Sequence, residues 1–419
     1  MKTLKERNKQ VNWHPYTQMK SVDIIPIVSG NGSYLYSEDG TAYIDAVSSW
    51  WVTLHGHSHP YIASKVTDQL NTLEQVIFAG FTHPKAIELS ERLLALLPRN
   101  QQKVFYSDNG STAVEVALKM CIQYHVNLQQ PRNKIIAFKN AYHGDTFGAM
   151  SVSERNFWTS PFHDRLFEVV FIDTPTQENL PTLFETIDAY VEDVVCFIYE
   201  PLVQGAAGML MHEAAHLSEL LNYCQSKGIL LIQDEIFVGF GRTGTLFAAD
   251  QLTCNPDVMC FSKGLTGGTM PMGITTATSA IYEAFYADEK TKAFFHGHSF
   301  TANPLACSAA LASLDLLLEP ETMKKINLIS EMHQVFSKKI PKEKALVRHC
   351  GTILAIELKF DEKSSYFNSK QPFLYDFFLK RNIIMRPLGN IIYLVPPYCI
   401  SESDLEVIYD SILELVESN

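Results

Sequence analysis

The sequence predicts an α/β protein with two domains: a large one with a mostly parallel sheet covered by helices on both faces, and a smaller α+β one. Between residues 98 and 262, short β-rich runs alternate with helical segments. This pattern is typical of parallel strands joined by crossover helices. Beyond residue 340, strands and helices mix without that alternation. With 419 residues, 46% of them hydrophobic, the chain can bury a core large enough for both domains.

The expected elements follow from local patterns. A hairpin is predicted at 33–46, because alternating apolar residues flank Asp39-Gly40, a dipeptide typical of tight turns. Strands of the large sheet are expected at 104–106, 135–138, 169–172, 194–199, 229–232 and 258–261, and strands of the small domain at 352–358 and 391–394. Apolar spacing predicts helices at 60–73, 84–97, 111–125, 321–339, 371–381 and 402–417, and a further helical pattern beyond Pro304. We therefore divide the chain into an N-terminal arm and hairpin belonging to the small domain (1–60), a large domain (61–310) and a C-terminal small domain (311–419).

Composition narrows the function. The chain has 34 basic and 46 acidic residues, a formal charge of -12, and no long run of one sign. This balance disfavours binding to nucleic acid or a membrane surface and favours small-molecule partners. The eight cysteines are scattered and none forms a CxxC pair, which is typical of free thiols in a reducing compartment. Since no signal-peptide core and no apolar run of about 18 residues is present, a cytoplasmic protein is expected.

Two of the expected strands end in residues with complementary chemistry. One apolar run ends at Asp234, and a second leads to Lys263 in a glycine-rich loop. Desolvation at a strand end lowers the pKa of a lysine and favours its nucleophilic amine. A lysine that attaches to pyridoxal phosphate and an aspartate at the pyridinium nitrogen are what this cofactor requires. The ordinary alternatives are a solvated lysine and a structural acidic pair.

Two other loops at strand ends fit the same cofactor. Residues 107–112 follow a strand and open a helix, so free N–H groups and the helix dipole favour a phosphate there. A routine helix cap by serine or asparagine explains the same letters. Tyr142 also follows a strand, and its ring can stack on a flat cofactor, although an ordinary loop tyrosine is the simpler interpretation.

Other enzyme classes leave weaker signals. Asp234-Glu235 resembles the acidic strand of a nucleotide hydrolase, but no GxxxxGK[ST] loop occurs in the chain. Residues 239–244 match G-x-G-x-x-G of a dinucleotide-binding oxidoreductase, but the segment that follows is too short and broken for its crossover helix. Alternating histidines at 55–59 and 296–298 suggest a zinc hydrolase, yet no further ligand follows within a few residues of either group. We expect no metal.

The motifs together resemble the class III (ω-type) aminotransferases of fold type I. The resemblance covers nearly the whole chain. It rests on residues 13–17, 48–51, 109–111, 142–145, 200–205, 234–235, 239–244, 262–268, 303–307, 386–387 and 393–398. It implies the fold of the pyridoxal-phosphate-dependent transferases, whose large domain has a mostly parallel seven-stranded sheet. Gly297-His298-Ser299 stands where the family has Gly-Pro-Thr, which keeps a hydroxyl group.

The resemblance also implies residue roles. The catalytic set is Lys263, which attaches the cofactor and moves a proton, together with Asp234 and Tyr16. The cofactor-binding set is Gly110, Ser111, Tyr142, Asp234, Lys263, His298 and Ser299, with Ser299 of the partner subunit reaching the phosphate. The substrate-binding set is Tyr16, Trp50, Tyr142, Gly297 and Arg386, where Arg386 pairs with the substrate carboxylate.

The implied activity belongs to the biotin-synthesis branch of the family. The segment that follows Glu200 reads Gln204-Gly205-Ala206-Ala207-Gly208, not the Gly-Glu-Gly-Gly of other class III enzymes, and this favours that branch. We expect a homodimer with a shared active site that uses S-adenosylmethionine to aminate 8-amino-7-oxononanoate. A lysine-using enzyme, a general ω-amino-acid aminotransferase and, remotely, a nicotinamide-dependent oxidoreductase are the alternatives.

Overall fold

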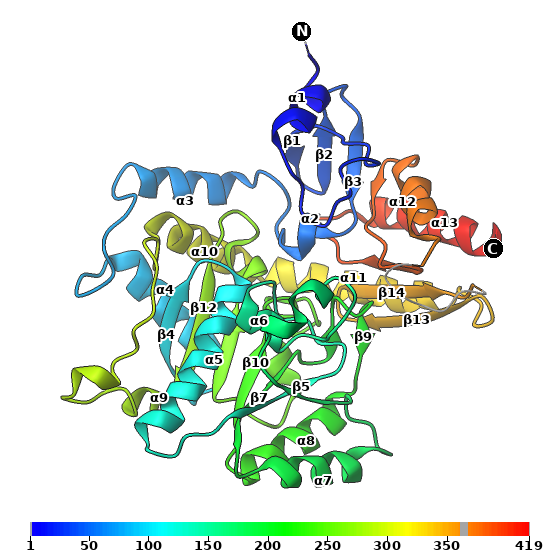
Figure 1. Cartoon of the computed structure of the whole chain (residues 1–419). Coiled ribbons are helices and arrows are strands. Elements are labelled where there is room, and N and C mark those ends of the chain that lie inside the picture. Colours follow the sequence, from blue (N-terminus) through cyan, green and yellow to red (C-terminus); the bar gives the residue numbers. More distant parts are fainter. Residues whose placement is uncertain (1, 361–367, 419) are drawn as a thin grey trace.

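A seven-stranded sheet organises the computed structural model, which describes residues 2–360 and 368–418 (Figure 1). Its strands, in spatial order, are β4 (Gln101–Ser107), β12 (Gly273–Thr278), β11 (Val258–Phe261), β10 (Leu230–Asp234), β7 (Val194–Tyr199), β5 (Lys134–Phe138) and β6 (Val170–Ile172). Only β12 runs against its neighbours, so the carboxyl ends of the other six meet at one edge. This confirms the predicted fold class.

Helices cover both faces of the sheet. On β7, Cys196 and Ile198 belong to the cluster packed by α5 (Gly110–Asn127), whereas Phe197 and Tyr199 belong to the cluster packed by α7 (Leu180–Tyr190) and α8 (Ala214–Ser226). Successive side chains of a strand point to opposite faces, so an apolar run buried throughout indicates a two-sided core. Further helices are α3 (Pro60–Leu70), α4 (Pro84–Leu96), α6 (Phe147–Ser151), α9 (Ser279–Glu283) and α10 (Pro304–Leu317).

The two ends of the chain share a second sheet. Its order is β1 (Ile27–Asn31), β2 (Tyr34–Ser37), β3 (Ala42–Asp45) and β15 (Ile383–Ile384). The β2–β3 pair is the predicted hairpin, with Gly40 at φ +85° in its turn. Because β15 pairs with β3, the N-terminal hairpin and the C-terminal part of the chain are joined.

The remaining C-terminal elements form an α+β layer. They are the sheet β13 (Ala345–Cys350), β14 (Ile353–Leu358) and β16 (Ile391–Leu394), with helices α11 (Pro320–Ser337), α12 (Gln371–Leu379) and α13 (Glu402–Ser418). The proposed domain ranges include a few residues that lie outside the described ones, namely 1, 361–367 and 419. The division at 60 and 310 therefore stays a proposal. α10 spans the second of these boundaries.

One strand of the large sheet gave no clear signal in the sequence. β12 is rich in threonine, and Thr275 and Thr276 are fully buried. Their hydroxyls donate hydrogen bonds to the carbonyl oxygen of Ala113 at 2.8 Å and to Oε1 of Gln101 at 2.7 Å. Partners distant in sequence thus make these polar side chains compatible with a core position.

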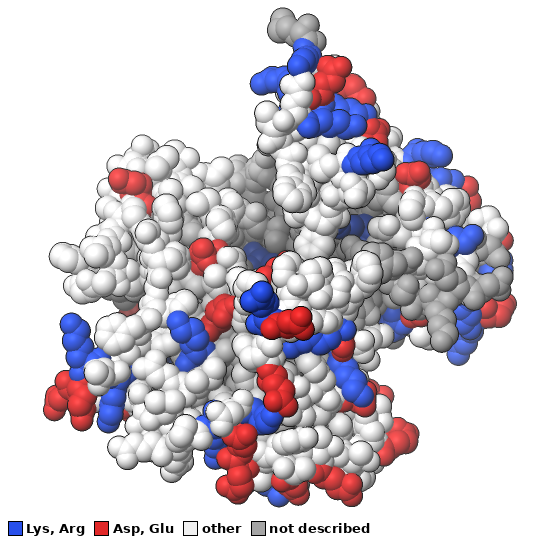
Figure 2. Space-filling view, in the orientation of Figure 1, with Lys and Arg blue, Asp and Glu red and all other residues white. Residues whose placement is uncertain are grey.

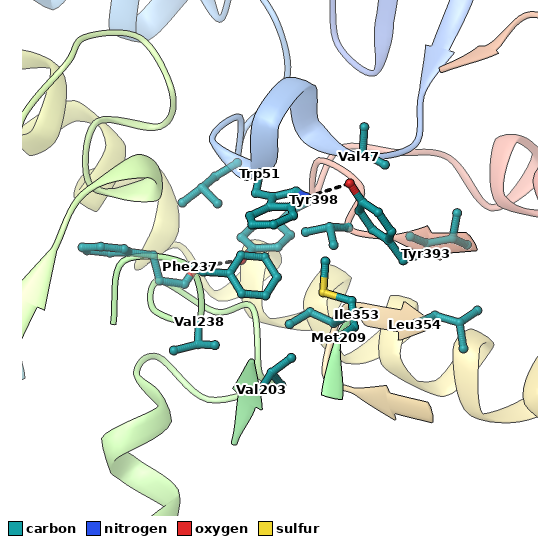
Figure 3. Close-up of a cluster of buried hydrophobic side chains, with 14 of the residues drawn as sticks. Val47, Trp51, Val203, Met209, Phe237, Val238, Ile353, Leu354, Tyr393 and Tyr398 are labelled. Atoms are coloured by element: carbon teal, nitrogen blue, oxygen red, sulfur yellow. Dashed lines mark hydrogen bonds between the residues drawn. The ribbon is translucent and has the colours of Figure 1, made fainter. Parts of the chain in front are cut away.

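A buried aromatic cluster joins the large sheet to both chain ends (Figure 3). Trp51 comes from the short helix α2 (Ser48–Trp51), Phe237 from the loop after β10, and Tyr393 from β16. The Trp51 and Phe237 rings lie 4.7 Å apart, and Trp51 Nε1 donates a hydrogen bond to the Tyr393 hydroxyl at 3.1 Å. The three parts of the chain are thereby fixed beneath the edge where the strands end.

Arg242 strengthens the same junction. Its guanidinium is buried and donates hydrogen bonds to the carbonyl oxygens of Pro396 at 2.7 Å and Thr53 at 3.3 Å. Its own carbonyl accepts the N–H of Thr352 at 2.9 Å. One side chain therefore satisfies buried carbonyls from both ends of the chain.

We predict that Arg242→Met lowers the free energy of unfolding by about 3 kcal/mol, because two buried carbonyls lose their donor. Thermal and urea unfolding followed by circular dichroism measure this change. Arg99→Met, at an exposed arginine, is the control and should leave the unfolding midpoint unchanged. Equal midpoints for both variants would contradict the role given to Arg242.

Candidate active site

A cavity of about 480 Å³ lies where the parallel strands end. Its walls come from the segments that follow β4, β5, β7, β10 and β11. This cofactor cavity is lined by Trp51, Asn109, Gly110, Ser111, Tyr142, His143, Gly144, Asp145, Thr146, Glu200, Ala206, Asp234, Ile236, Phe237, Val238 and Lys263. Ligands of open α/β sheets bind at this edge, and five of the predicted cofactor residues meet there.

Asp234 and Lys263 are delivered by neighbouring strands. Asp234 is the last residue of β10 and pairs in register with Cys260 of β11, two residues before Ser262-Lys263. The aspartate is 4% exposed, and His143 Nδ1 lies 2.7 Å from its Oδ2. Its other carboxylate oxygen accepts the N–H of Ile236 at 3.0 Å. The carboxylate is therefore held in one orientation at the cavity wall.

The amine of Lys263 lies against aromatic rings. Its Nζ is 5.0 Å from the ring centroid of Trp51 and 5.8 Å from that of Phe237. Desolvation lowers the pKa of Lys263 below the ordinary lysine value, although the charges of Asp234 and Glu200 oppose this effect. The neutral, nucleophilic form of this amine is thus more accessible than that of a solvated lysine.

The turn that is predicted to bind phosphate is a helix cap in the structure. Asn109 caps α5, because its Oδ1 accepts the N–H of Thr112 at 3.0 Å. Within the described residues, the backbone N–H groups of Gly110 and Ser111 make no hydrogen bond. A Cβ on Gly144, at φ +134°, would lie 2.1 Å from Ser111 Oγ. A helix start with free N–H groups and a side-chain-free neighbour fits an anionic phosphate.

Glu200 fixes the loop that carries Tyr142. It follows β7, and its carboxylate accepts the N–H groups of Tyr142 at 2.9 Å and Gly205 at 3.1 Å. Burial raises the pKa of Glu200 to about 7, although nearby His143 acts in the opposite direction. The tyrosine is thereby held in the wall of the cofactor cavity.

A second cavity of about 290 Å³ adjoins the first. This substrate cavity is lined by Pro15, Tyr16, Trp50, Trp51, Tyr142, Asp145, Trp158, Ala206, Lys263, Arg386, Leu388 and Tyr393. The Arg386 guanidinium lies 4.2 Å from the ring centroid of Trp50, and the Tyr16 and Trp50 rings lie 5.5 Å apart. The structure therefore brings the predicted substrate residues Tyr16, Trp50, Tyr142 and Arg386 together with Lys263.

The backbone is strained at and beside several residues that line the substrate cavity. Tyr16, Ser49, Trp51 and Lys263 all have positive φ, between +46° and +66°. Residues other than glycine adopt this conformation only when their surroundings enforce it, and such strain is concentrated at functional sites. Asp45 supplies part of that enforcement, because its Oδ2 accepts the N–H of Ser49 at 2.7 Å.

Three predicted residues lie outside both cavities. Gly297, His298 and Ser299 belong to the loop before α10, and the Ser299 carbonyl accepts a hydrogen bond from Gln75 Nε2 at 2.6 Å. Within one chain this loop reaches neither cavity. Its role in the site stays a prediction that involves a second copy.

Among the lining residues to which sequence reasoning gave no role are His143, Asp145, Trp158 and Glu200. His143 and Asp145 stand beside Tyr142, so the motif that identified the tyrosine contained them. Asp145 accepts a hydrogen bond from the Tyr16 hydroxyl, which joins the N-terminal arm to this loop. Glu200 directly follows the buried strand β7, and Asp234 is the last residue of the buried strand β10, so both carboxylates have the same sequence signal. Trp158 lies in an irregular segment and had no such signal.

The glycine-rich turn and the alternating histidines have structural roles. Residues 239–244 form a turn, and the only helix in the following segment is the short 3-10 helix Ala248–Gln251. His57 Nε2 lies 2.9 Å from Asp45 Oδ2, and His55 Nε2 lies 3.1 Å from Ser313 Oγ. In the described part of the chain, no group of three or more potential ligands is placed to hold a metal ion.

No helix among the described residues is long and apolar enough to cross a membrane.

Known proteins resemble the chain over nearly its whole length. A protein of Synechococcus elongatus named adenosylmethionine-8-amino-7-oxononanoate aminotransferase is 44% identical over 97% of this chain and 98% of its own. A Helicobacter pylori protein of the same name is 36% identical, over 97% of this chain and 95% of its own.

Solved structures agree in fold. The Methanocaldococcus jannaschii protein of the same name superposes with a TM-score of 0.93 at 35% identity, over 99% of this chain and 98% of its own. A Thermomicrobium roseum ω-transaminase also reaches 0.93, at 28% identity and the same coverage. The fold therefore does not distinguish an adenosylmethionine-8-amino-7-oxononanoate aminotransferase from an ω-transaminase. Residues 16–416 match the family described as "Aminotransferase class-III", and the chain belongs to that family.

Proposed function

We propose that the protein transfers the amino group of S-adenosylmethionine to the ketone of 8-amino-7-oxononanoate, giving 7,8-diaminononanoate for biotin synthesis, with pyridoxal phosphate as cofactor. One observation carries the chemistry: Lys263 and Asp234 share a cavity that opens onto a second cavity containing Arg386. The names of relatives at 34–44% identity support the choice of substrates.

The residues of the cofactor cavity fit pyridoxal phosphate. Free N–H groups of Gly110 and Ser111 suit its phosphate, Tyr142 suits the face of its ring, and Asp234 suits its ring nitrogen. When bound, the cofactor supplies an electron sink that allows the carbon bearing an amine to lose a proton. Asp234 would keep the ring nitrogen protonated, and His143, 2.7 Å from Asp234 Oδ2, would hold that carboxylate in one orientation.

Lys263 has two tasks in this proposal. Its amine would hold the cofactor covalently. The same amine would also move a proton at the substrate Cα, first as a general base and then as a general acid. The rings of Trp51 and Phe237 lie 5.0 and 5.8 Å from this amine, and desolvation lowers the pKa of Lys263, which favours both tasks.

Arg386 and the aromatic walls suit the substrates. A guanidinium binds a carboxylate with two parallel hydrogen bonds. The Arg386 guanidinium lies 4.2 Å from the ring centroid of Trp50, and the flat rings of Tyr16 and Trp50 accept either an aliphatic chain or an adenosyl group. Both substrates can therefore use the same cavity in turn.

A general ω-amino-acid aminotransferase is the second candidate. The Thermomicrobium roseum ω-transaminase, with a TM-score of 0.93, favours it as far as the fold is concerned. Ala206 argues against it, because this small apolar residue lines both cavities where other class III enzymes are expected to have a carboxylate.

The proposal includes a homodimer. Asn303 Nδ2 donates a hydrogen bond to the Glu74 carbonyl at 3.2 Å, so the loop before α10 and the segment after α3 form one surface. Four large apolar side chains of these segments are 64–68% exposed: Ile77, Phe81, Phe295 and Phe300. Few charged side chains lie over α3, α4 and their connection (Figure 2). Such a patch is typical of an interface, and a second copy there would bring Ser299 of the partner subunit to the phosphate.

We also place the protein in the cytoplasm. All eight cysteines are free and six of them are buried. Free buried thiols are typical of proteins in a reducing compartment.

Supplying 8-amino-7-oxononanoate with one amino donor at a time tests the reaction. We predict that S-adenosylmethionine gives the diamine and that lysine and ω-amino acids give none, because only the first donor matches the proposed branch. Mass spectrometry of the product measures this, with Lys263→Ala as the inactive control. If lysine gives the diamine and S-adenosylmethionine does not, the proposed amino donor is wrong. If no donor gives the diamine, the general ω-amino-acid aminotransferase is favoured.

Hybrid dimers test the shared site. Ser299→Ala should weaken cofactor binding about tenfold through one lost hydrogen bond to a charged group. A hybrid of one Lys263→Ala subunit and one Ser299→Ala subunit then contains one intact site, and its activity at limiting cofactor should be about half that of the wild type. If Ser299 acts within its own subunit, no site is intact, and the hybrid should have about half the activity of the Ser299→Ala dimer.

A further inference from the structure

The turn formed by residues 48–51 has an unusual backbone conformation. Ser48, Ser49 and Trp51 have φ values of +51°, +59° and +66°. Trp50, between them, has φ -120° and ψ 56°, so the turn is not a regular helix. Residues other than glycine adopt positive φ at an energetic cost, and they keep it only where the surroundings enforce it. Three such residues within four positions therefore need contacts that hold them in place.

A buried carboxylate supplies such contacts. Asp45 is the last residue of β3 and is fully buried. Its Oδ1 accepts the N–H of Val47 at 3.2 Å, and its Oδ2 accepts the N–H of Ser49 at 2.7 Å. Burying a carboxylate is costly unless hydrogen-bond donors surround it. The turn thus satisfies the Asp45 carboxylate, and the carboxylate fixes the turn.

His57 holds the Asp45 carboxylate in turn. Its Nε2 lies 2.9 Å from Asp45 Oδ2, so this nitrogen carries a proton and donates a hydrogen bond to the carboxylate. The N–H of His57 donates to the Gly32 carbonyl at 2.8 Å, and the N–H of Gly32 donates to the His57 carbonyl at 3.2 Å. A Cβ on Gly30 would lie 2.8 Å from the Cβ of His57. His57 is therefore packed against the N-terminal sheet and connects that sheet to the turn through Asp45.

The C-terminal part of the chain fixes only the start of the turn. Ser48 Oγ donates a hydrogen bond to the Val395 carbonyl at 2.7 Å, and the N–H of Val395 donates to the Ala46 carbonyl at 3.0 Å. Neither bond reaches Ser49, whose N–H is held by Asp45. The path of the backbone from Ser49 onward therefore depends on Asp45 and on the histidine behind it.

The two tryptophans that follow Ser49 border the groups proposed to act on the substrate. The ring centroid of Trp50 lies 4.2 Å from the Arg386 guanidinium. The ring centroid of Trp51 lies 5.0 Å from Lys263 Nζ. Since both residues come directly after Ser49 in the chain, a change in its φ or ψ moves both rings at once.

We propose that Asp45 and His57 are positioning residues for the reaction: together they set the turn that places its two tryptophans against the carboxylate-binding arginine and the reactive lysine. Neither residue lines the cofactor cavity or the substrate cavity, so both act through the turn. This inference rests on the proposed function, because the tasks of the arginine and the lysine belong to it. It also gives one of the alternating histidines at 55–59 a role that needs no metal.

Substitutions of His57 test the effect on substrate binding in the full-length holoenzyme. His57→Leu removes the donor and should raise the apparent Kd of S-adenosylmethionine about tenfold, because the arginine is no longer aligned. The concentration dependence of cofactor amination, followed by absorbance, measures this Kd. His57→Gln keeps an N–H for Asp45 and should stay within about twofold of the wild type. His125→Leu is the matched control, since it removes the hydrogen bond of another buried histidine, 3.0 Å from the Val195 carbonyl, and should leave the Kd unchanged.

A second measurement concerns Lys263 and needs no amino donor. The pH of half-maximal attachment of pyridoxal phosphate to the apoprotein should rise by about half a unit in His57→Leu. When Trp51 moves, water reaches the lysine amine and its pKa rises toward the ordinary value, while the charges of Asp234 and Glu200 stay in place. His57→Gln and His125→Leu should keep the wild-type midpoint.

The outcomes separate this inference from the proposed function. Asp45→Asn removes one acceptor oxygen at nearly constant size and should reproduce both changes if His57→Leu does not fold. Unchanged Kd and midpoint in folded His57→Leu or Asp45→Asn, or His57→Gln as impaired as His57→Leu, would overturn the inference. If S-adenosylmethionine does not aminate the wild-type cofactor, the proposed donor is wrong, and the attachment midpoints still decide whether Asp45 and His57 position the turn.

Discussion

The site depends on the pairing of two neighbouring parallel strands. Because β10 and β11 run side by side in the same direction, Asp234 and Lys263 emerge at the same edge of the sheet. No loop flexibility is needed to bring the carboxylate and the amine into one cavity. The predicted phosphate turn after β4 and the Tyr142 loop after β5 start from the same sheet, so strand spacing determines how far apart these walls of the cavity lie.

The ends of the chain complete what the sheet begins. The N-terminal arm supplies Tyr16 and α2 supplies Trp50, while the C-terminal part supplies Arg386. The buried cluster of Trp51, Phe237 and Tyr393 holds these segments against the sheet (Figure 3). The cofactor chemistry is therefore determined by the large sheet, whereas the substrate cavity is formed by segments that meet only after the whole chain has folded.

This difference explains how much the sequence alone could predict. The residues at strand ends, Asp234, Lys263 and Tyr142, were predictable because apolar runs mark buried strands and parallel strands share a carboxyl edge. β12 was not, since its buried threonines depend on distant hydrogen-bond partners. Trp158 lies in an irregular segment, and only the tertiary structure places it in the wall of the substrate cavity. The proposed contribution of residues 297–299 would come from a second copy of the chain, which no local pattern describes.

The most direct test concerns the amine at the end of β11. Apoprotein is mixed with pyridoxal phosphate over a range of pH, reduced with borohydride, digested and mapped by mass spectrometry. Because desolvation lowers the pKa of Lys263, attachment should occur on Lys263 alone and should rise with pH at values below the ordinary lysine pKa of 10.5. Cofactor on another lysine, or a rise only near the ordinary pKa, would contradict the account.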